Sequence, residues 1–278
     1  MSQKPAPPAV HIRPERGAGV LNPLEIWKFR RLLRQMISRN FQTRVASSPM
    51  SLVWGFIRPG IMTLAFLFLR NVSGADFGTS VPYGLHIFTG LCLWFLFQDT
   101  AVQVAGSVAT DSALSQKVYF PKVLSPIAMV LSRWIDLAVI SAAVAIVQFA
   151  MGVPFSLHIV YLAPAMVTLL LLAFGLGVLF AGLMIYHPDY RKILETILYL
   201  GLFLSPVLFS KEILPTTVQE YYLVNPMVGI LSAVRGAMFE PELIDFFAWL
   251  VAAGISVALS LAGLIVLSKA ARNSAEKI

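Results

Sequence analysis

Residues 111–126, DSALSQKVYFPKVLSP, form a polar and basic segment between two long apolar runs. One run covers about residues 85–109, and the other covers residues 127–151. Each run is long enough to cross a bilayer as a helix, which takes roughly 20 residues. The pattern therefore predicts two membrane spans joined by an exposed loop.

The loop itself has two interpretations. Pro121 and Pro126 interrupt it and leave room for one short helix near residues 113–118. It is either an ordinary connection or a docking element for a partner. Aromatic residues and prolines among cations favour docking, because such residues are unusual in a loop that only connects. We expect five of its residues to be exposed to water: Lys117, Tyr119, Phe120, Pro121 and Lys122.

The composition places the chain among membrane proteins. Hydrophobic residues make up 58% of the 278 residues, above the roughly 45–50% of soluble domains, and charged residues make up only 13%. The net charge of +7 arises mainly in the tails and two loops, which indicates membrane topology and not nucleic-acid binding. The only cysteine, Cys92, excludes an internal disulfide and a thiol metal cluster.

We predict an all-α protein with three regions and six transmembrane helices. Residues 1–22 are rich in proline and glycine and are expected to be a disordered cytoplasmic tail without a cleavable signal peptide. Residues 23–48 predict an amphipathic helix at the inner headgroup layer, with a soluble helix packed on a partner as the alternative. Residues 49–278 form the membrane domain. The predicted spans are residues 52–69, 85–109, 127–151, 157–185, 193–209 and 246–268.

The distribution of basic residues predicts the orientation. Sixteen lysines and arginines lie in the amino-terminal segment, the 111–126 loop, the 186–192 loop and the carboxyl terminus. Only Arg70, Lys211 and Arg235 lie on the other side. Because positive charge is retained in the cytoplasm, both termini are expected to be cytoplasmic.

The segment between the last two spans has its own signals. Pro206 removes a backbone donor and is expected to bend or end the fifth span. Asn225 and Pro226 are typical of a helix start, and they predict a short helix ending near Met238. The apolar content of the segment predicts two short helices that dip into the membrane from outside. The alternative is a surface loop with one amphipathic helix.

Several polar residues near the spans need a partner or a role. Arg133 and Asp136 are three residues apart on one helix and are expected to pair. Asp99 has no obvious local partner and is expected to face a pore or cap a broken turn. Small residues at 173–182 in the fourth span predict close helix packing. The four histidines are scattered without ligand spacing, so no metal site and no catalytic site is expected.

Four motifs together resemble one transporter family. They are WGFIRP at residues 54–59, KVYFPKVLSP at 117–126, SPVLF at 205–209, and NPM at 225–227 with VRGAMF at 234–239. Their order and spacing resemble the membrane subunit of ABC-2-type exporters, in particular permeases for O-antigen and other cell-surface polysaccharides. The resemblance covers about residues 23–269. It departs in the loop YHPDYRK at 186–192, where such permeases often have an Arg-Asp pair.

The resemblance implies a transport subunit and not an enzyme. Two copies would form the pathway, and two separate cytoplasmic ATPase subunits would bind ATP and magnesium, so this chain needs no cofactor. The absence of a G-x4-G-K-[ST] phosphate loop from these residues agrees with that division. The implied ATPase-docking residues are Lys117, Val118, Tyr119, Phe120, Pro121 and Lys122.

The implied substrate is a polysaccharide on a polyprenyl diphosphate carrier, moved across the bacterial inner membrane. Membrane lipids are the other expected contacts of the chain. Arg58 is expected either to reach the headgroups or to hold the diphosphate. The candidate channel-lining residues are Phe66, Phe88, Trp94, Phe97, Gln98, Asp99, Tyr199 and Phe203. For each aromatic residue, packing or lipid contact is the alternative role. The candidate residues of a periplasmic gate are Pro206, Tyr221, Tyr222, Asn225, Pro226 and Arg235.

Two kinds of alternative remain at this point. Teichoic acid, capsule or a small lipophilic drug would use the same transporter architecture. A membrane-embedded enzyme of lipid-linked sugar metabolism is the alternative from another class. Such an enzyme would be expected to have clustered acidic residues at one membrane face, whereas the predicted cytoplasmic loops contain only Asp111 and Asp189 among cations.

Overall fold

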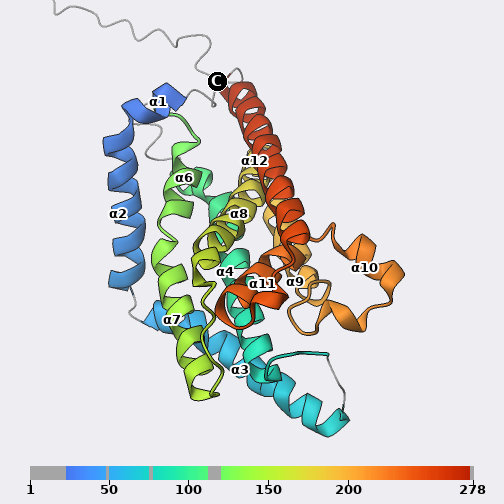
Figure 1. Ribbon diagram of the computed structural model, residues 1–278. Helices are drawn as coiled ribbons and strands as arrows, with labels where there is room; N and C mark the ends of the chain where they lie inside the picture. The colour runs from blue at the N-terminus through green and yellow to red at the C-terminus, as the bar shows by residue number, and fades with distance from the viewer. Residues whose placement is uncertain (1–22, 48–49, 75–77, 112–119, 276–278) are drawn as a thin grey trace, which may run out of the picture.

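The computed structural model describes residues 23–47, 50–74, 78–111 and 120–275 (Figure 1). These residues form α-helices, short 3-10 helices and turns, and no β-strand occurs among them. The predicted all-helical class is therefore confirmed. Predictions about the tail at residues 1–22 and about the short helix at 113–118 lie outside the described residues.

Five helical segments in the described residues are long and apolar enough to cross a membrane. They match five of the six predicted spans and include two interrupted segments. These segments are α3 (Met50–Ser73), α4 (Tyr83–Thr110), α6 (Leu124–Leu131) with α7 (Trp134–Ala150), η1 (Ile159–Tyr161) with α8 (Leu162–Met184), and α12 (Phe246–Ala275).

The predicted fifth span has a different form. Its helix, α9 (Tyr190–Phe203), has only 14 residues, fewer than the roughly 20 that cross a bilayer. The helix ends at Phe203, and its C-cap, Leu204, lies two residues before Pro206, which cannot donate a backbone hydrogen bond. The structure thus supports five spans by length, and the sixth span and the orientation stay predictions.

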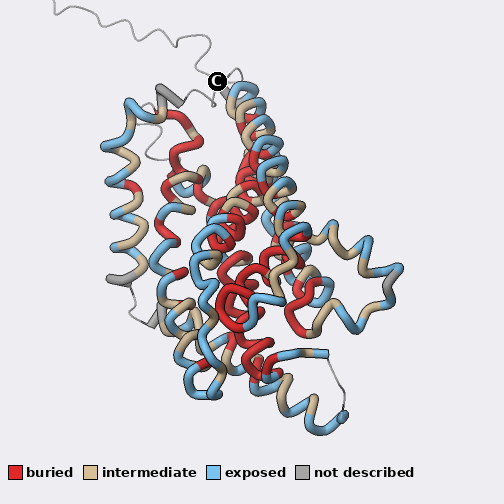
Figure 2. The backbone as a smooth tube through the Cα atoms, viewed as in Figure 1, coloured by how far each residue is buried: buried red, intermediate tan, exposed pale blue. Residues whose placement is uncertain are grey.

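Helix α4 forms the centre of the molecule. Every residue from Tyr83 to Phe97 is buried, and the centre of the molecule is correspondingly red in Figure 2. A helix that is apolar all round must be surrounded by other protein segments or by lipid. Helices α3, α7, α8 and α9 cover α4, so that the largest hydrophobic core lies along its length.

Helices α8 and α12 pack closely because glycines lie between them. A Cβ atom at Gly175 would lie 2.6 Å from the backbone nitrogen of Ser260, and one at Gly182 would lie 2.8 Å from that of Leu267. No side chain fits at either position, so small residues allow the two backbones to approach. The predicted close packing along residues 173–182 is confirmed.

The amino-terminal helix is also confirmed, with one break. It comprises α1 (Pro23–Lys28) and α2 (Arg30–Ser47), and α2 lies beside α6 (Figure 1). Met36 of α2 is buried in a small core with Phe120, Val123 and Leu124. This core connects α2 to the loop that precedes α6. The position of α2 in the headgroup layer stays a prediction.

Between α9 and α12 the chain forms four short helices. They are η2 (Lys211–Ile213), α10 (Thr216–Tyr222), α11 (Pro226–Met238) and η3 (Pro241–Leu243). Helix α10 projects from the body of the molecule, whereas α11 is buried against α12 (Figure 1). The predicted start and end of α11 are confirmed. The depth of these helices in a membrane stays a prediction.

Candidate functional site

A charged cavity of about 700 Å³ lies between α2, α3, α4 and the α6–α7 segment. Its apolar wall includes Trp54, Phe95 and Ile140. The charged residues around it come from four separate parts of the chain: Arg39, Arg44, Arg58, Asp99, Asp111, Arg133 and Asp136. Four arginines against three aspartates give the lining a formal charge of +1. We call this space the charged cavity.

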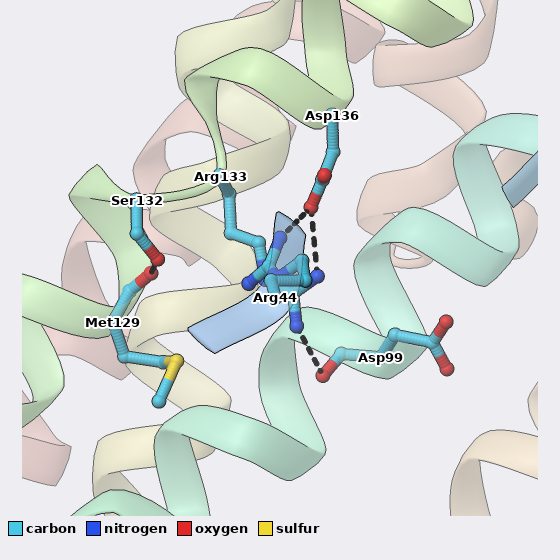
Figure 3. Close-up of polar contacts among 6 residues, drawn as sticks. All are labelled: Arg44, Asp99, Met129, Ser132, Arg133 and Asp136. Carbon is cyan, nitrogen blue, oxygen red and sulfur yellow. Dashed lines mark hydrogen bonds and ion pairs between the residues drawn. The ribbon is translucent and has the colours of Figure 1, made fainter. Parts of the chain in front are cut away.

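Asp136 is the centre of the deepest ion-pair group. It accepts hydrogen bonds from Arg44 of α2 and from Arg133 at the α6–α7 break (Figure 3). The Arg133 Nη1 atom lies 2.8 Å from Asp136 Oδ2, and Arg133 is only 5% exposed. Its Nη2 atom lies 3.5 Å from the backbone oxygen of Asp99. The predicted pairing of Arg133 with Asp136 is confirmed, and Arg44 is the partner that sequence analysis missed.

A second ion pair connects α2 to the end of α4. The Arg39 Nη2 atom lies 2.6 Å from Asp111 Oδ1. Asp111 is buried at the C-cap of α4, directly before residues 112–119, whereas Arg39 is half-exposed. Together with the Asp136 pairs, this contact holds α2 over the cavity. Each partner is charged and partly desolvated, so loss of either would leave its counterion unpaired.

Arg58 is the most accessible of the four arginines in the cavity. It lies on α3 next to Pro59, and its guanidinium group lies 3.9 Å from the centre of the Phe95 ring. Its Nη1 atom is 3.9 Å from Asp99 Oδ1, and about half of each side chain is exposed. Asp99 therefore has a partner on another helix, which sequence spacing did not show. At 3.9 Å, this contact is longer than a direct hydrogen bond.

The loop before α6 differs from the sequence-based expectation. Phe120 and Pro121 are buried, whereas we expected both to be exposed to water. That expectation was wrong because the Phe120 side chain packs against Met36 of α2, a contact between segments far apart in the sequence. Lys122 is half-buried beside a second cavity of about 260 Å³. Lys117, Val118 and Tyr119 lie outside the described residues, and the docking role of the loop stays a prediction.

Five of the six candidate channel-lining aromatics fall into two groups. Phe88, Trp94 and Phe97 are buried inside the subunit, where the Trp94 and Phe97 rings lie 5.5 Å apart. Tyr199 and Phe203 are exposed on α9, with ring centres 5.9 Å apart. Only the second group presents aromatic surface outward in this conformation.

The remaining lining candidates lie between these extremes. Phe66 of α3 is partly buried against the main core, and Gln98 of α4 is half-buried. The Asp99 side chain, about half exposed, faces the charged cavity. The role of the whole set in lining a channel stays a prediction.

The backbone that follows α9 is held by Asn225, the N-cap residue of α11. The Asn225 Nδ2 atom donates to the Leu204 backbone oxygen and to Ser205 Oγ, both at 3.0 Å. Asn225 Oδ1 accepts from the Met227 backbone N–H at 3.0 Å and so caps α11, with Pro226 in the first turn. One side chain therefore joins the end of α9 to the start of α11.

Arg235 completes this network from the buried face of α11. Its Nη1 atom donates to the Pro206 backbone oxygen at 2.9 Å, and Nη2 donates to those of His86 at 3.1 Å and Val207 at 3.3 Å. A Cβ atom at Gly90 would lie 2.8 Å from Arg235 Nη2 and 3.0 Å from the Val207 backbone oxygen, so a side chain there would press against both partners of this hydrogen bond. We call Asn225, Arg235 and the carbonyl groups they bind the carbonyl network.

The other two candidate gate residues lie on α10. Tyr221 is 81% exposed, while the Tyr222 ring stacks on Phe209 with centres 6.3 Å apart. Burial raises the pKa of Tyr222 to about 12. The structure thus brings Pro206, Asn225, Pro226 and Arg235 together and separates Tyr221 from them. Their role as a periplasmic gate stays a prediction.

The fold and these two sites define a multi-pass helical membrane protein with a charged cavity and a carbonyl network. A family profile described as ABC-2 type transporter matches residues 31–239. The chain belongs to the ABC-2 type transporter family, as its four motifs indicated.

Curated relatives match over most of their length. The O-antigen export system permease protein RfbA of Myxococcus xanthus is 23% identical over 260 residues, covering 91% of this chain and 98% of the relative. A protein of the same name from Klebsiella pneumoniae is 20% identical, covering 86% and 91%. The capsule polysaccharide export inner-membrane protein CtrC of Neisseria meningitidis serogroup B is 23% identical, covering 78% and 82%.

Proposed function

We propose that this chain is the membrane-spanning subunit of an ATP-driven exporter that moves a lipid-linked O-antigen polysaccharide across a bacterial inner membrane. The observation that carries the proposal is the nearly end-to-end similarity to the O-antigen export permease of Myxococcus xanthus, with 91% of this chain covered. Membership of the ABC-2 type transporter family supports the same transport class.

In this proposal the chain works as a pair with two ATPase subunits. These 278 residues contain no phosphate-binding loop of the G-x4-G-K-[ST] type, so ATP would be hydrolysed by the partner. The 111–126 loop would transmit the motion. Support comes from the core of Phe120 and Met36 and from the ion pair of Asp111 with Arg39, because both connect the ends of this loop to α2.

The charged cavity would receive the diphosphate of the lipid carrier. A diphosphate is multiply charged and prefers arginine, which offers several donors in a planar arrangement. Arg58 is the primary candidate because its side chain is half exposed and its contact with Asp99 is long. The apolar wall of Trp54 and Phe95 would contact the first isoprenoid units.

A capsule polysaccharide is the second candidate substrate. The relative CtrC, named for capsule polysaccharide export, matches 78% of this chain at 23% identity, the same identity as the Myxococcus protein. The two candidates differ in the polysaccharide carried, so transport assays with each glycan separate them.

The deciding experiment is reconstitution with and without the partner. The chain is co-purified with its candidate ATPase, placed in vesicles, and supplied with ATP and lipid-linked glycan. We expect ATP-dependent appearance of the glycan on the opposite face only when both proteins are present. Glycan transfer or ATP hydrolysis by the chain alone would contradict the proposal. Transport of a capsule glycan but not of a lipid-linked O-antigen would select the second candidate.

A further inference from the structure

A second polar cavity, of about 400 Å³, lies at the α11 side of the molecule and shares no residue with the charged cavity. We call it the outer cavity. Its walls come from the start of α4, the η2 segment, α11, η3 and the first residue of α12. Its volume is within the range of small-molecule sites, about 300–1,000 Å³. Its residues have no role in the function proposed so far, apart from Pro206 and Arg235.

Both cationic side chains of the outer cavity, Lys211 and Arg235, form contacts within the protein, and only the buried Arg235 Nε atom has no hydrogen-bond partner among the described residues. The Lys211 Nζ atom lies 2.5 Å from Asp245 Oδ2. Both terminal nitrogens of Arg235 donate to backbone oxygens of the carbonyl network. A phosphate or carboxylate ligand would therefore have to displace existing bonds. The cavity is poorly suited to an anion.

Hydrogen-bond acceptors, in contrast, are available. Glu212 and Glu242 line the cavity, and neither forms a salt bridge with any residue that the structure describes. His86 also lines it and is only 5% exposed, and its Nε2 atom has no hydrogen-bond partner among the described residues. A buried polar atom without a partner is costly, so His86 Nε2 would be stabilised by any hydroxyl donor that comes within reach of it.

An aromatic ring lies at the edge of this group. Phe246, at the start of α12, lines the cavity and is 55% exposed. Its ring centre lies 5.5 Å from that of Tyr161 and 6.3 Å from that of Trp249. These neighbours hold the ring in position from behind. Phe246 therefore offers a fixed apolar face next to the carboxylates.

We propose that the outer cavity binds a neutral saccharide unit. A sugar has many hydroxyl donors for Glu212, Glu242 and His86, and it has C–H faces that pack on an aromatic ring. Its neutrality suits a cavity whose cations are already paired. The inference rests on the proposed function only for the source of the sugar, which would be the exported glycan after it has crossed the membrane.

The test measures binding to the full-length chain in lipid nanodiscs by saturation-transfer difference NMR, without ATP or a partner subunit. The probes are two neutral disaccharides, α-1,2-mannobiose and lactose, with 3′-sialyllactose as the anionic probe. We expect signals from a neutral disaccharide and weaker signals from the anionic sugar. Glu242→Gln and Phe246→Ala are each expected to weaken neutral binding about tenfold, as expected for one lost charged hydrogen bond or one ring contact.

Matched controls lie next to both positions. Glu240 and Phe247 are exposed neighbours that do not line the outer cavity, so Glu240→Gln and Phe247→Ala are expected to bind like the parent protein. A cooperative thermal unfolding transition shows that each variant is folded. If one of the two cavity variants is unstable, the other is enough for the test.

Four results would overturn the inference: no neutral signal, equal loss in the controls, equal binding of the anionic sugar, or displacement of the sugar by calcium. Since binding is measured without transport, a negative result does not bear on export. If the parent protein binds the sugar but does not export the glycan, that result would instead count against the proposed function.

Discussion

The charged cavity and the carbonyl network solve the same physical problem in different ways. Both contain polar groups in a chain that is 58% hydrophobic. In the charged cavity, arginine side chains pair with aspartate side chains from other helices, and several of these groups are partly exposed. In the carbonyl network, Asn225 and Arg235 bind backbone oxygens next to a proline break, and Arg235 is buried.

This difference has a functional consequence. A carboxylate that holds an arginine can be replaced by another anion, because the arginine keeps a charged partner after the exchange. A backbone carbonyl offers no such exchange, since its position is set by the chain. The charged cavity is thus suited to ligand binding, and the carbonyl network is suited to holding the end of α9 against α4 and α11.

The largest expected effect is at the carbonyl network. Arg235→Met would leave the carbonyl groups of His86, Pro206 and Val207 without these donors in a buried site. We expect a loss of about 3–5 kcal/mol in unfolding free energy. Thermal or denaturant unfolding of the purified protein measures it. Arg272→Met, at an exposed position of α12, is the control, and equal stability of the two variants would refute the assigned role.

The next effect is in the charged cavity. Asp136→Asn would remove the carboxylate shared by Arg44 and the buried Arg133, with an expected cost of about 3 kcal/mol. Glu195→Gln removes an exposed pair with Arg191 and is expected to cost no more than about 0.5 kcal/mol. If both variants unfold at the same denaturant concentration, the ion-pair group does not stabilise α2 and α7.

Asn225 has two roles in the carbonyl network, as a donor and as an acceptor, and two substitutions distinguish them. Asn225→Ala would remove both the cap of α11 and the bond to Leu204, with an expected loss of about 2 kcal/mol. Asn225→Asp would keep the accepting cap and remove only the donor. We expect the aspartate variant to be intermediate in unfolding experiments. An aspartate variant as stable as the parent would show that the bonds to α9 contribute nothing.

Arg58 is expected to affect transport and not stability. It is half exposed, so Arg58→Ala would change the unfolding free energy little, but in the reconstituted exporter it would lower glycan transport about tenfold, as for one lost ionic contact. Arg58→Lys would keep part of the activity. Arg70→Ala is the matched control, because Arg70 lies on the same helix and also stacks on a ring. Normal transport by Arg58→Ala would exclude the diphosphate role.

The smallest effect concerns the Lys211–Asp245 pair. Burial by itself would raise the pKa of Asp245, but hydrogen bonds from the Ala248 backbone and from Lys211 lower it overall. A carboxyl with a lowered folded-state pKa stabilises the protein above its unfolded value of about 3.9, and this contribution is lost as the pH falls through the folded value. Lys211→Met is therefore expected to reduce stability by up to about 1 kcal/mol at pH 7 and to lose this difference near pH 3. Unfolding curves at both pH values measure it, and a larger difference at low pH would contradict the sign.

Local sequence signals predicted much of the fold. Apolar runs placed five spans, and Asn225 followed by Pro226 placed the start of α11, because a cap acts within one turn of its own helix. The pairing of Arg133 with Asp136 followed from helical spacing for the same reason. Small residues in α8 indicated a close helix contact without naming α12 as the partner.

The partners across helices could not be predicted in this way. Asp99 with Arg58, Asp136 with Arg44 and Asp111 with Arg39 join residues 41, 92 and 72 positions apart, by the difference of their numbers. Nine basic residues in the amino-terminal segment offered many equivalent choices. The burial of Phe120 was missed for the same reason, since its contact with Met36 depends on how α2 packs.

The sequence by itself determined that this is a helical membrane protein with a break near Pro206 and a transporter-like order of motifs. Those properties depend on hydrophobicity and on residues within one turn of each other. Only the tertiary structure decided which charges meet in the charged cavity and which carbonyl groups Arg235 binds. The physical reason is that contacts between different helices depend on how those helices pack. Packing depends on the whole chain at once.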